Sequence, residues 1–257
     1  MKLLNYNISD EVFAFSTYRH GGFSKGTYLS FNINPYTGDS YESISKNKDL
    51  LIKYLNIQPN QLIIPHQIHE TNVLNIDIDF INSSETLKNK LLEGVDILTT
   101  ELNQYCICIS TADCIPILIY DIRNKVASCV HAGWRGTVNR ISEKAVHYME
   151  KFFGTNPLNC KAVIGPGISV DNFEVGDEVF NVFQMNGFDM KKISIHKKNK
   201  WHINLPECNR IQLLNCGILN KNIINSNICT YSNYKDFFSA RRMGVNSGRI
   251  LTGILIK

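Results

Sequence analysis

Apolar positions recur with a helical period in several parts of the chain. The clearest case is the segment 41–55, where Ser40 stands in the position of an N-cap and the apolar residues share one face. The same period runs through 138–153 and stops at Gly154, a typical helix end. Two further helices are expected at 175–187 and 205–216, and the polar segment 83–92 is expected to be a loop or a short helix.

Shorter apolar runs, rich in β-branched residues, lie between these helices and predict strands. The runs 115–120 and 125–130 are joined by the short link 121–124, of the kind found in hairpins. Other expected strands are 11–16, 62–64, 71–76, 106–109, 161–164, 228–230 and 249–256. Strands and helices mix without strict alternation, which favours mixed sheets over a single parallel sheet.

Composition places the chain among ordinary globular proteins. Of its 257 residues 44% are hydrophobic, enough to bury a sizeable core. There is no internal repeat, low-complexity tract or Pro/Gly/Ser-rich linker. We therefore expect one α/β domain over residues 1–257.

Charge and cysteine usage narrow the choice of partners and compartment. The formal net charge of +4 is mild, and the basic residues are scattered apart from 191–192 and 197–200, which we interpret as a solvated loop. Nucleic acid is therefore not an expected partner. No apolar stretch approaches the roughly 18 residues of a membrane span, and the first residues lack the apolar core of a secretory signal. The eight cysteines show no C-x-x-C spacing and are expected to stay reduced in the cytoplasm.

Three residues with soft donor atoms stand where apolar runs give way to loops. His131 ends the run 126–130, Cys114 follows the run 105–109, and His69 follows the run 62–64. Loops anchored on a rigid scaffold are the usual location of site residues. Two imidazoles and one thiolate suit Zn²⁺, and three protein ligands are typical of a catalytic zinc site with one open position. His69, Cys114 and His131 are therefore the candidate metal ligands and catalytic residues.

Each candidate competes with a structural alternative. A cysteine inside an apolar strand is usually a small buried hydrophobe, which is how we interpret Cys106, Cys108 and Cys129. His66 and His69 lie three apart at the end of a strand, where side chains point to opposite faces, so only one should reach the metal.

Three charged residues next to these motifs are candidates for substrate binding or catalysis. Arg135 directly follows Trp134 in a glycine-rich loop, and its guanidinium could bind phosphate or carboxylate with two parallel hydrogen bonds. Arg19 presents a weaker case of the same kind. Asp113 is a candidate to orient a metal ligand or to act as an acid or base. The structural alternative is that these arginines only form salt bridges that stabilise their loops.

Taken together, the motifs resemble those of one family, the laccase-domain or polyphenol-oxidase-like purine nucleoside phosphorylases. The resemblance covers nearly the whole chain, and the TADC and HAGWRG segments are its most specific parts. The matching segments are Thr17–Ser24, Ser30–Asn32, Gln67–His69, Gly94–Asp96, Thr111–Cys114, His131–Gly136, Ile164–Ile168, Phe173–Gly176 and Phe237–Arg242.

The resemblance implies a fold, a metal site and an activity. The fold would be a layered α/β sandwich with two mixed sheets. The family's Gln-x-His pattern selects His69 over His66, and its TADC cysteine selects Cys114. The implied activities are zinc-dependent phosphorolysis of purine nucleosides, including methylthioadenosine, and deamination of adenosine. Arg19 and Arg135 are then candidates to bind phosphate.

Three rival functions remain open from the sequence. Cys114, His131 and Asp113 could form a nucleophile, a base and an orienting acid in a hydrolase, and family members are implicated in editing peptidoglycan precursors. A His₂Cys site also binds copper well, in line with the family's older name as phenol oxidases. The third rival is a metal-stabilised binding module without catalysis, which the three-ligand count disfavours.

Overall fold

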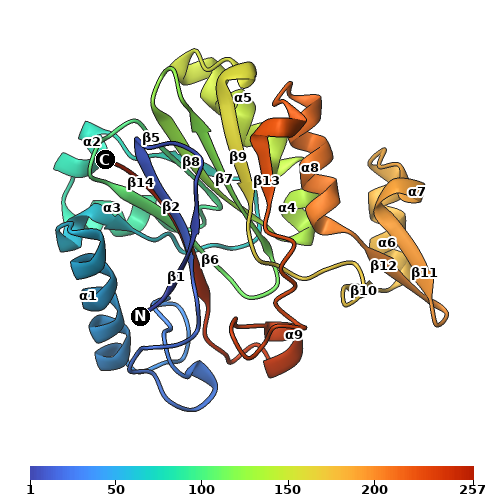
Figure 1. Ribbon diagram of the computed structural model, residues 1–257, viewed down its shortest axis with the longest axis horizontal. Helices are drawn as coiled ribbons and strands as arrows, with labels where there is room; N and C mark the ends of the chain where they lie inside the picture. Colours follow the sequence, from blue (N-terminus) through green and yellow to red (C-terminus); the bar gives the residue numbers. More distant parts are fainter.

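The computed structural model describes all 257 residues, and its elements form a layered α/β sandwich (Figure 1). Helix α1 (Tyr41–Leu55) covers one large sheet, and helices α5 (Ile141–Phe153) and α8 (Leu205–Asn215) cover the other. The fold class expected from the sequence, a sandwich of mixed sheets flanked by helices, is confirmed.

The first large sheet has five strands and is mixed. Its strands are antiparallel except for the parallel pair β6 and β3 at one edge. Their order is β1 (Leu3–Tyr6), β2 (Val12–Thr17), β14 (Ile250–Ile256), β6 (Cys106–Thr111) and β3 (Leu62–Ile63).

The second large sheet has six strands and carries a parallel pair at each edge. At its centre the hairpin of β7 and β8 confirms the expected link at 121–124. The order is β13 (Ile223–Asn225), β9 (Cys160–Ile164), β7 (Ile115–Asp121), β8 (Val126–Ala132), β5 (Ile97–Thr100) and β4 (Val73–Asn75).

A small antiparallel sheet forms a lobe beside α8, at the right of Figure 1. It consists of β10 (Glu174–Val175), β12 (Lys200–Ile203) and β11 (Ser194–Lys197). The remaining helices are α2 (Ile78–Asn82), α3 (Glu85–Leu91), α4 (Trp134–Val138), α6 (Asp177–Met185), α7 (Met190–Ile193) and α9 (Ala240–Met243). Short 3₁₀ helices lie at Gly26–Tyr28, Pro59–Gln61, Pro157–Asn159 and Asn220–Asn222.

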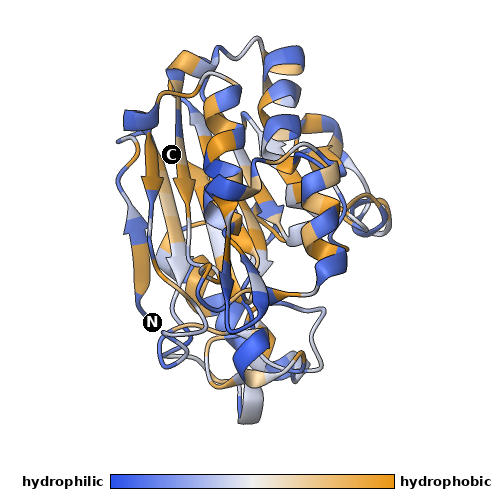
Figure 2. Cartoon of the chain, turned by 90° about the vertical axis from the view of Figure 1, so that its right-hand side faces the viewer, coloured by the Kyte–Doolittle hydropathy of each residue, from blue (hydrophilic) through white to orange (hydrophobic).

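The hydrophobic core is divided by the sheets. One cluster fills the space between the two large sheets, with Ile109 and Ile254 from one and Leu118 and Cys129 from the other. Separate clusters lie under α1 and under α5 and α8. Figure 2 shows apolar residues concentrated on the strands and on parts of the covering helices. Because both faces of the central strands are buried, these strands read as continuous apolar runs.

Two expected elements differ from the sequence prediction. The helix expected over 138–153 begins only at Ile141, as α5, because Arg140 adopts a left-handed φ of 61°. A separate short helix, α4, occupies the preceding segment, where a glycine-rich loop was expected. The strand expected at 228–230 is an isolated bridge between Cys229 and Gly167, and the edge strand is β13 instead.

The segment 197–200, interpreted as a solvated loop, is exposed and forms the tip of a hairpin between β11 and β12. Lys198 and Asn199 both have positive φ, at 51° and 60°, as a two-residue hairpin turn requires. None of the helices is both long enough and apolar enough to span a membrane.

Candidate metal centre

The three predicted ligands converge at one point, although they come from separate parts of the chain. His69 lies in the loop between β3 and β4, and His131 is close to the end of β8. Cys114 lies in the short crossing from β6 in one large sheet to β7 in the other. One donor atom from each residue lies within 4.8 Å of the other two. The site therefore sits where the two sheets meet.

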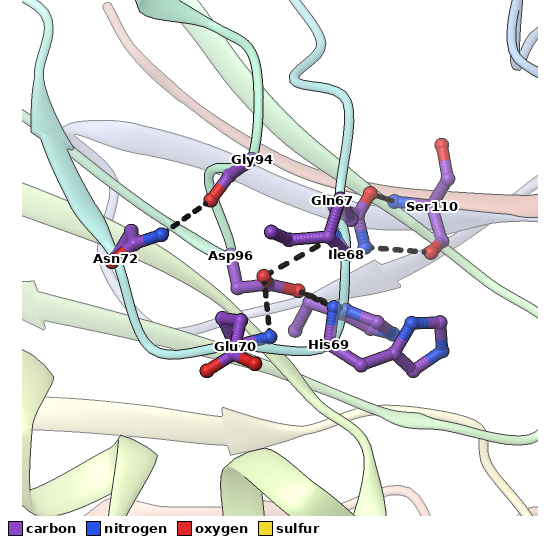
Figure 3. A network of polar contacts seen from close by, with 9 residues as sticks. Gln67, Ile68, His69, Glu70, Asn72, Gly94, Asp96 and Ser110 are labelled. Carbon is purple, nitrogen blue, oxygen red and sulfur yellow. Dashed lines mark hydrogen bonds and ion pairs between the residues drawn. The ribbon is translucent and has the colours of Figure 1, made fainter.

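The His69 turn is held in a strained conformation by a buried carboxylate. His69 has a φ of 68°, a left-handed value that is uncommon for a residue other than glycine. The Asp96 carboxylate accepts hydrogen bonds from the backbone N–H groups of Ile68 (3.3 Å), His69 (3.1 Å) and Glu70 (2.9 Å), as drawn in Figure 3. These bonds offset the backbone strain and fix the direction of the imidazole.

The same carboxylate also orients the second imidazole. Nδ1 of His131 lies 2.6 Å from Oδ1 of Asp96, and both side chains are buried. This contact engages Nδ1 and leaves Nε2 as the nitrogen that can bind a metal. A carboxylate behind a ligating histidine is the usual arrangement in zinc proteins, where it fixes the tautomer and increases basicity.

Gln67 fastens the His69 loop to the strand that leads to Cys114. Its Oε1 accepts a hydrogen bond from the backbone N–H of Ser110 at 2.7 Å, and its Nε2 donates to the carbonyl of Ser110 at 3.0 Å (Figure 3). The glutamine of the Gln-x-His pattern therefore fixes the loop, while the histidine supplies the donor.

The electrostatics of the cluster favour a thiolate. Burial alone would raise the pKa of Cys114, but charges on His131 and His69 and hydrogen bonds from both imidazoles outweigh burial and lower it to about 6. Burial alone would likewise lower the pKa of His131, but the Cys114 thiolate and the Asp96 carboxylate raise it to about 9. A thiolate near neutral pH is the form of cysteine that binds metals.

The donor set fits a zinc ion. Two imidazole nitrogens and one thiolate at these separations match the ligands of a catalytic zinc site. Gly133 keeps the space between them free, because a Cβ there would lie 3.1 Å from Cδ2 of His69 and 3.3 Å from Sγ of Cys114. The sequence prediction that these three residues bind zinc therefore remains a proposal that the geometry supports.

A cavity of about 280 Å³ opens beside the three ligands. His66 lies on its wall rather than in the cluster, with Nδ1 2.6 Å from the Glu93 carboxylate. The ring of Tyr36, 46% exposed, stacks on His66 at 4.2 Å between centroids. Arg249 also lines this cavity and brings a positive charge to it. Burial lowers the pKa of its guanidinium.

Asp113 directs its carboxylate toward the C-terminal part of the chain. Its oxygens accept hydrogen bonds from the Thr230 hydroxyl and from the backbone N–H of Arg241, both at 2.7 Å. Asp113 also has a φ of 89°. The carboxylate that orients a ligand is Asp96, whereas Asp113 fastens neighbouring loops to the Cys114 turn. A catalytic role for Asp113 stays a prediction.

The two arginines predicted to bind phosphate lie away from the cavity wall. Arg19 donates to the carbonyls of Leu29 and Tyr234, at distances of 2.7 to 3.0 Å, which uses most of its N–H groups. Arg135 is exposed on α4, with its guanidinium 4.5 Å from the Trp134 ring centroid. Neither residue lines the cavity.

Sequence reasoning gave no role to three residues that build the site. Asp96 and Gln67 lie inside the segments Gly94–Asp96 and Gln67–His69 that carry the family resemblance, so their motifs were the available signal. Arg249 lies in no such segment. Its place beside the cluster follows from the pairing of β14 with β6 across more than a hundred residues of sequence.

Comparisons with known proteins agree with this architecture. Residues 13–257 match the family model described as multi-copper polyphenol oxidoreductase laccase. The chain is 48% identical over 244 residues to a protein of Bacteroides thetaiotaomicron named purine nucleoside phosphorylase, covering 94% of this chain and 90% of that protein. It is 37% identical to a prokaryotic protein named adenosine deaminase RL5, covering 96% and 94% respectively.

Solved structures with the same fold include two bacillar proteins. The hypothetical protein YfiH of Bacillus licheniformis has a TM-score of 0.92 and 27% identity, covering 99% of this chain and 96% of that one. YlmD of Geobacillus stearothermophilus has a TM-score of 0.90 and 26% identity, covering 98% and 94%.

Proposed function

The chain belongs to the family described as multi-copper polyphenol oxidoreductase laccase, and within it we propose that this protein is a zinc-dependent purine nucleoside phosphorylase. The observation that carries the proposal is the convergence of His69, Cys114 and His131 at an open cavity. Relatives named purine nucleoside phosphorylase and adenosine deaminase support an enzymatic role and point to nucleosides as substrates.

His69, Cys114 and His131 would hold the zinc ion. When bound, the ion supplies Lewis acidity that polarises a substrate atom or lowers the pKa of water toward about 7. Asp96 keeps the imidazole of His131 in the metal-binding tautomer and holds the His69 loop in place. Both functions of Asp96 reduce the movement of the ligands on substrate binding.

The rim of the cavity offers a flat aromatic surface for a base. The stacked pair of Tyr36 and His66 at the rim supports binding of a planar purine ring.

In phosphorolysis the bond between C1′ and the base nitrogen breaks, and a phosphate oxygen bonds to C1′. The departing base takes the electron pair and the proton of hydrogen phosphate, so the products are the free base and ribose 1-phosphate.

The proposed substrates are inosine, guanosine, adenosine and methylthioadenosine, with adenosine also deaminated at C6. Deamination replaces the C6 amino group by oxygen from water and releases ammonia. We place the enzyme in the cytoplasm, since all eight cysteines are free thiols.

One experiment tests both the metal and the reaction. The protein is purified without added metal, its metal content is measured, and hypoxanthine release from inosine is assayed with and without phosphate. We expect about one zinc per chain, phosphate-dependent release, and loss of metal and activity in Cys114→Ala. Full zinc occupancy in that variant would remove Cys114 from the ligand set, and copper in place of zinc would favour oxidation chemistry.

A second candidate, a cysteine hydrolase acting on peptidoglycan precursors, is favoured by one contact pattern. The carboxylate of Asp96, the imidazole of His131 and the low-pKa thiol of Cys114 are arranged like an acid, a base and a nucleophile. The two functions differ in thiol chemistry. A nucleophile reacts with iodoacetamide in the purified enzyme, whereas a zinc-bound thiolate is protected until the metal is chelated.

A further inference from the structure

Arg249 is the one cationic side chain on the wall of the metal-site cavity, apart from the imidazoles. It directly precedes β14, whose first residue, Ile250, pairs with Thr111 at the end of β6. Thr111 begins the turn that carries Cys114. Strand pairing therefore brings a guanidinium to the same corner of the molecule as the metal ligands.

The Arg249 guanidinium is anchored on one side and open on the other. Nη1 donates to the carbonyls of Ser247 at 2.5 Å and Gly248 at 3.0 Å, and Nη2 donates to the carbonyl of Val245 at 3.0 Å. A guanidinium has five N–H groups, so the Nε–H and the second Nη2 hydrogen have no protein partner. Nε and Nη2 form the edge that binds phosphate or carboxylate with two parallel hydrogen bonds.

No carboxylate lines the cavity wall beside this cation; the nearby negative charges that act on it are those of Cys114 and Asp113. None of the residues lining the cavity is Asp or Glu, and Arg249 makes no ion pair within 4.0 Å. A partly buried cation without a paired anion carries a desolvation cost that a bound anion would offset. A divalent metal with a single thiolate ligand adds further positive charge, so the loaded cavity favours an anion.

We propose that Arg249 binds the phosphate co-substrate, an inference that rests on the phosphorylase function proposed above. Its anchored side and free edge hold the anion beside the metal ligands without a rearrangement of the loop. Arg19 has donated most of its N–H groups to carbonyls, and Arg135 stands outside the cavity. Arg249 alone combines free donors with a place at the site.

The competing explanation is structural: Arg249 only balances the negative charges of Cys114 and Asp113, both of which act on its guanidinium. The two explanations predict different kinetics. A phosphate-binding residue affects the KM for phosphate, while a residue that only supports the ligands affects zinc retention, inosine binding and folding together.

The test compares zinc-loaded Arg249→Met, Arg249→Lys and Arg135→Met with Arg123→Met. Arg123→Met is the matched control, because it removes the same charge from the exposed turn between β7 and β8. The Kd of inorganic phosphate is measured by calorimetry, and the KM values of phosphate and inosine are measured in phosphorolysis. Zinc content and melting temperature are recorded for each variant.

For Arg249→Met we expect the Kd and KM of phosphate to rise about ten- to hundredfold, with the inosine KM and zinc content close to wild type. Arg249→Lys should restore part of the affinity, and Arg123→Met and Arg135→Met should bind phosphate like wild type. Unchanged phosphate affinity in Arg249→Met would overturn the proposal, as would a common loss of zinc, inosine affinity and melting temperature. A phosphate effect confined to Arg135→Met would overturn it too.

The same measurements distinguish failure of the Arg249 assignment from failure of the proposed phosphorylase function. If the wild type binds phosphate through Arg249 but forms no ribose 1-phosphate, the anion site stands and the proposed reaction is wrong. If the wild type is an active phosphorylase and Arg249→Met is normal, the reaction stands and the Arg249 assignment is wrong. A wild type that neither binds phosphate nor uses it overturns both.

Discussion

Neighbouring residues of the candidate site have different positions and contacts. His69 and His66 are three positions apart, yet only His69 reaches the cluster, while His66 pairs with Glu93 on the cavity wall. The reason is the left-handed turn at His69, which the Asp96 carboxylate stabilises by accepting a hydrogen bond from the His69 backbone N–H. That only one histidine of this pair binds metal stays a prediction, and the position of His69 in the donor cluster supports it.

This division predicts unequal effects of two alanine substitutions. His69→Ala removes a donor and should abolish zinc binding and activity. His66→Ala removes a wall residue and should leave zinc content near wild type and a measurable fraction of activity. Metal analysis and the inosine assay check both. Equal and complete loss of zinc in the two variants would mean that the ligand set is misassigned.

The pKa values of the metal-free cluster predict how zinc affinity depends on pH. The pKa of His131 is about 9, so this imidazole must lose a proton on metal binding below that pH. Cys114, with a pKa of about 6, is already a thiolate above pH 6.

One proton is therefore released between pH 6 and 9, and the zinc Kd should fall about tenfold per pH unit before levelling above pH 9. Below pH 6 protonation of Cys114 makes the dependence steeper. A competition titration with a zinc chelator measures it, and a Kd independent of pH from 6 to 9 would contradict the thiolate–imidazolium pair.

At the scale of elements, local pattern predicted the longer helices and strands, but the short strands β1, β5, β10, β11 and β12 were not expected. Helix α1 begins and ends where its period and the Ser40 N-cap place it. The break at Arg140 has no such local signal, because a left-handed arginine is stabilised there by a contact of its side chain with Asn186, far away in the sequence. The edge strand β13 was missed for a similar reason, since its pairing with β9 decides it.

In the site, too, local sequence pattern does not reveal contacts between residues that are far apart in the sequence. Donor chemistry and strand-end positions brought forward His69, Cys114 and His131 as candidate ligands, because donor chemistry is visible in residue identity. The choice of His69 over His66 and of Cys114 over the other cysteines came from the family motifs, and the ligand set stays a prediction. Asp96 and Gln67 act through contacts across 27 to 43 positions, which no local pattern reveals. Family motifs marked these two residues without giving the physical reason for them.

Asp96, which directly precedes β5, contacts both the His69 turn and His131 of β8. Its substitution therefore tests how these elements together position the ligands. Asp96→Asn removes the charge that holds His131 and weakens the three hydrogen bonds to the His69 turn. We expect zinc affinity to fall about ten- to hundredfold. The matched control is Glu93→Gln, which makes the same carboxylate-to-amide change at a residue that contacts His66, and it should retain wild-type affinity. Equal zinc affinity in both variants would contradict the role of Asp96.

At the scale of the whole molecule, the site joins the two large sheets. Cys114 lies on the crossing between them, and His131 belongs to the six-stranded sheet. A metal bound here therefore cross-links two layers and stabilises the folded state relative to the unfolded chain.

Chelation should lower the melting temperature. With free zinc at a hundred times its Kd, binding contributes about 2.7 kcal/mol. For a domain of this size that is a shift of about 5–10 °C. Calorimetry before and after dialysis against a chelator measures the shift, and Cys114→Ala, which lacks a ligand, should show none. Identical melting curves for zinc-loaded and chelated wild type would argue against a structural link through the metal.

We propose that one metal centre in this fold supports the transfer of a ribosyl group from a purine to phosphate. The most direct measurement is the ³¹P spectrum of a reaction of inosine, inorganic phosphate and the zinc-loaded protein. We expect a growing ribose 1-phosphate signal that matches hypoxanthine release mole for mole, and no such signal with Cys114→Ala. Hypoxanthine released together with free ribose, or no release at all, would contradict it.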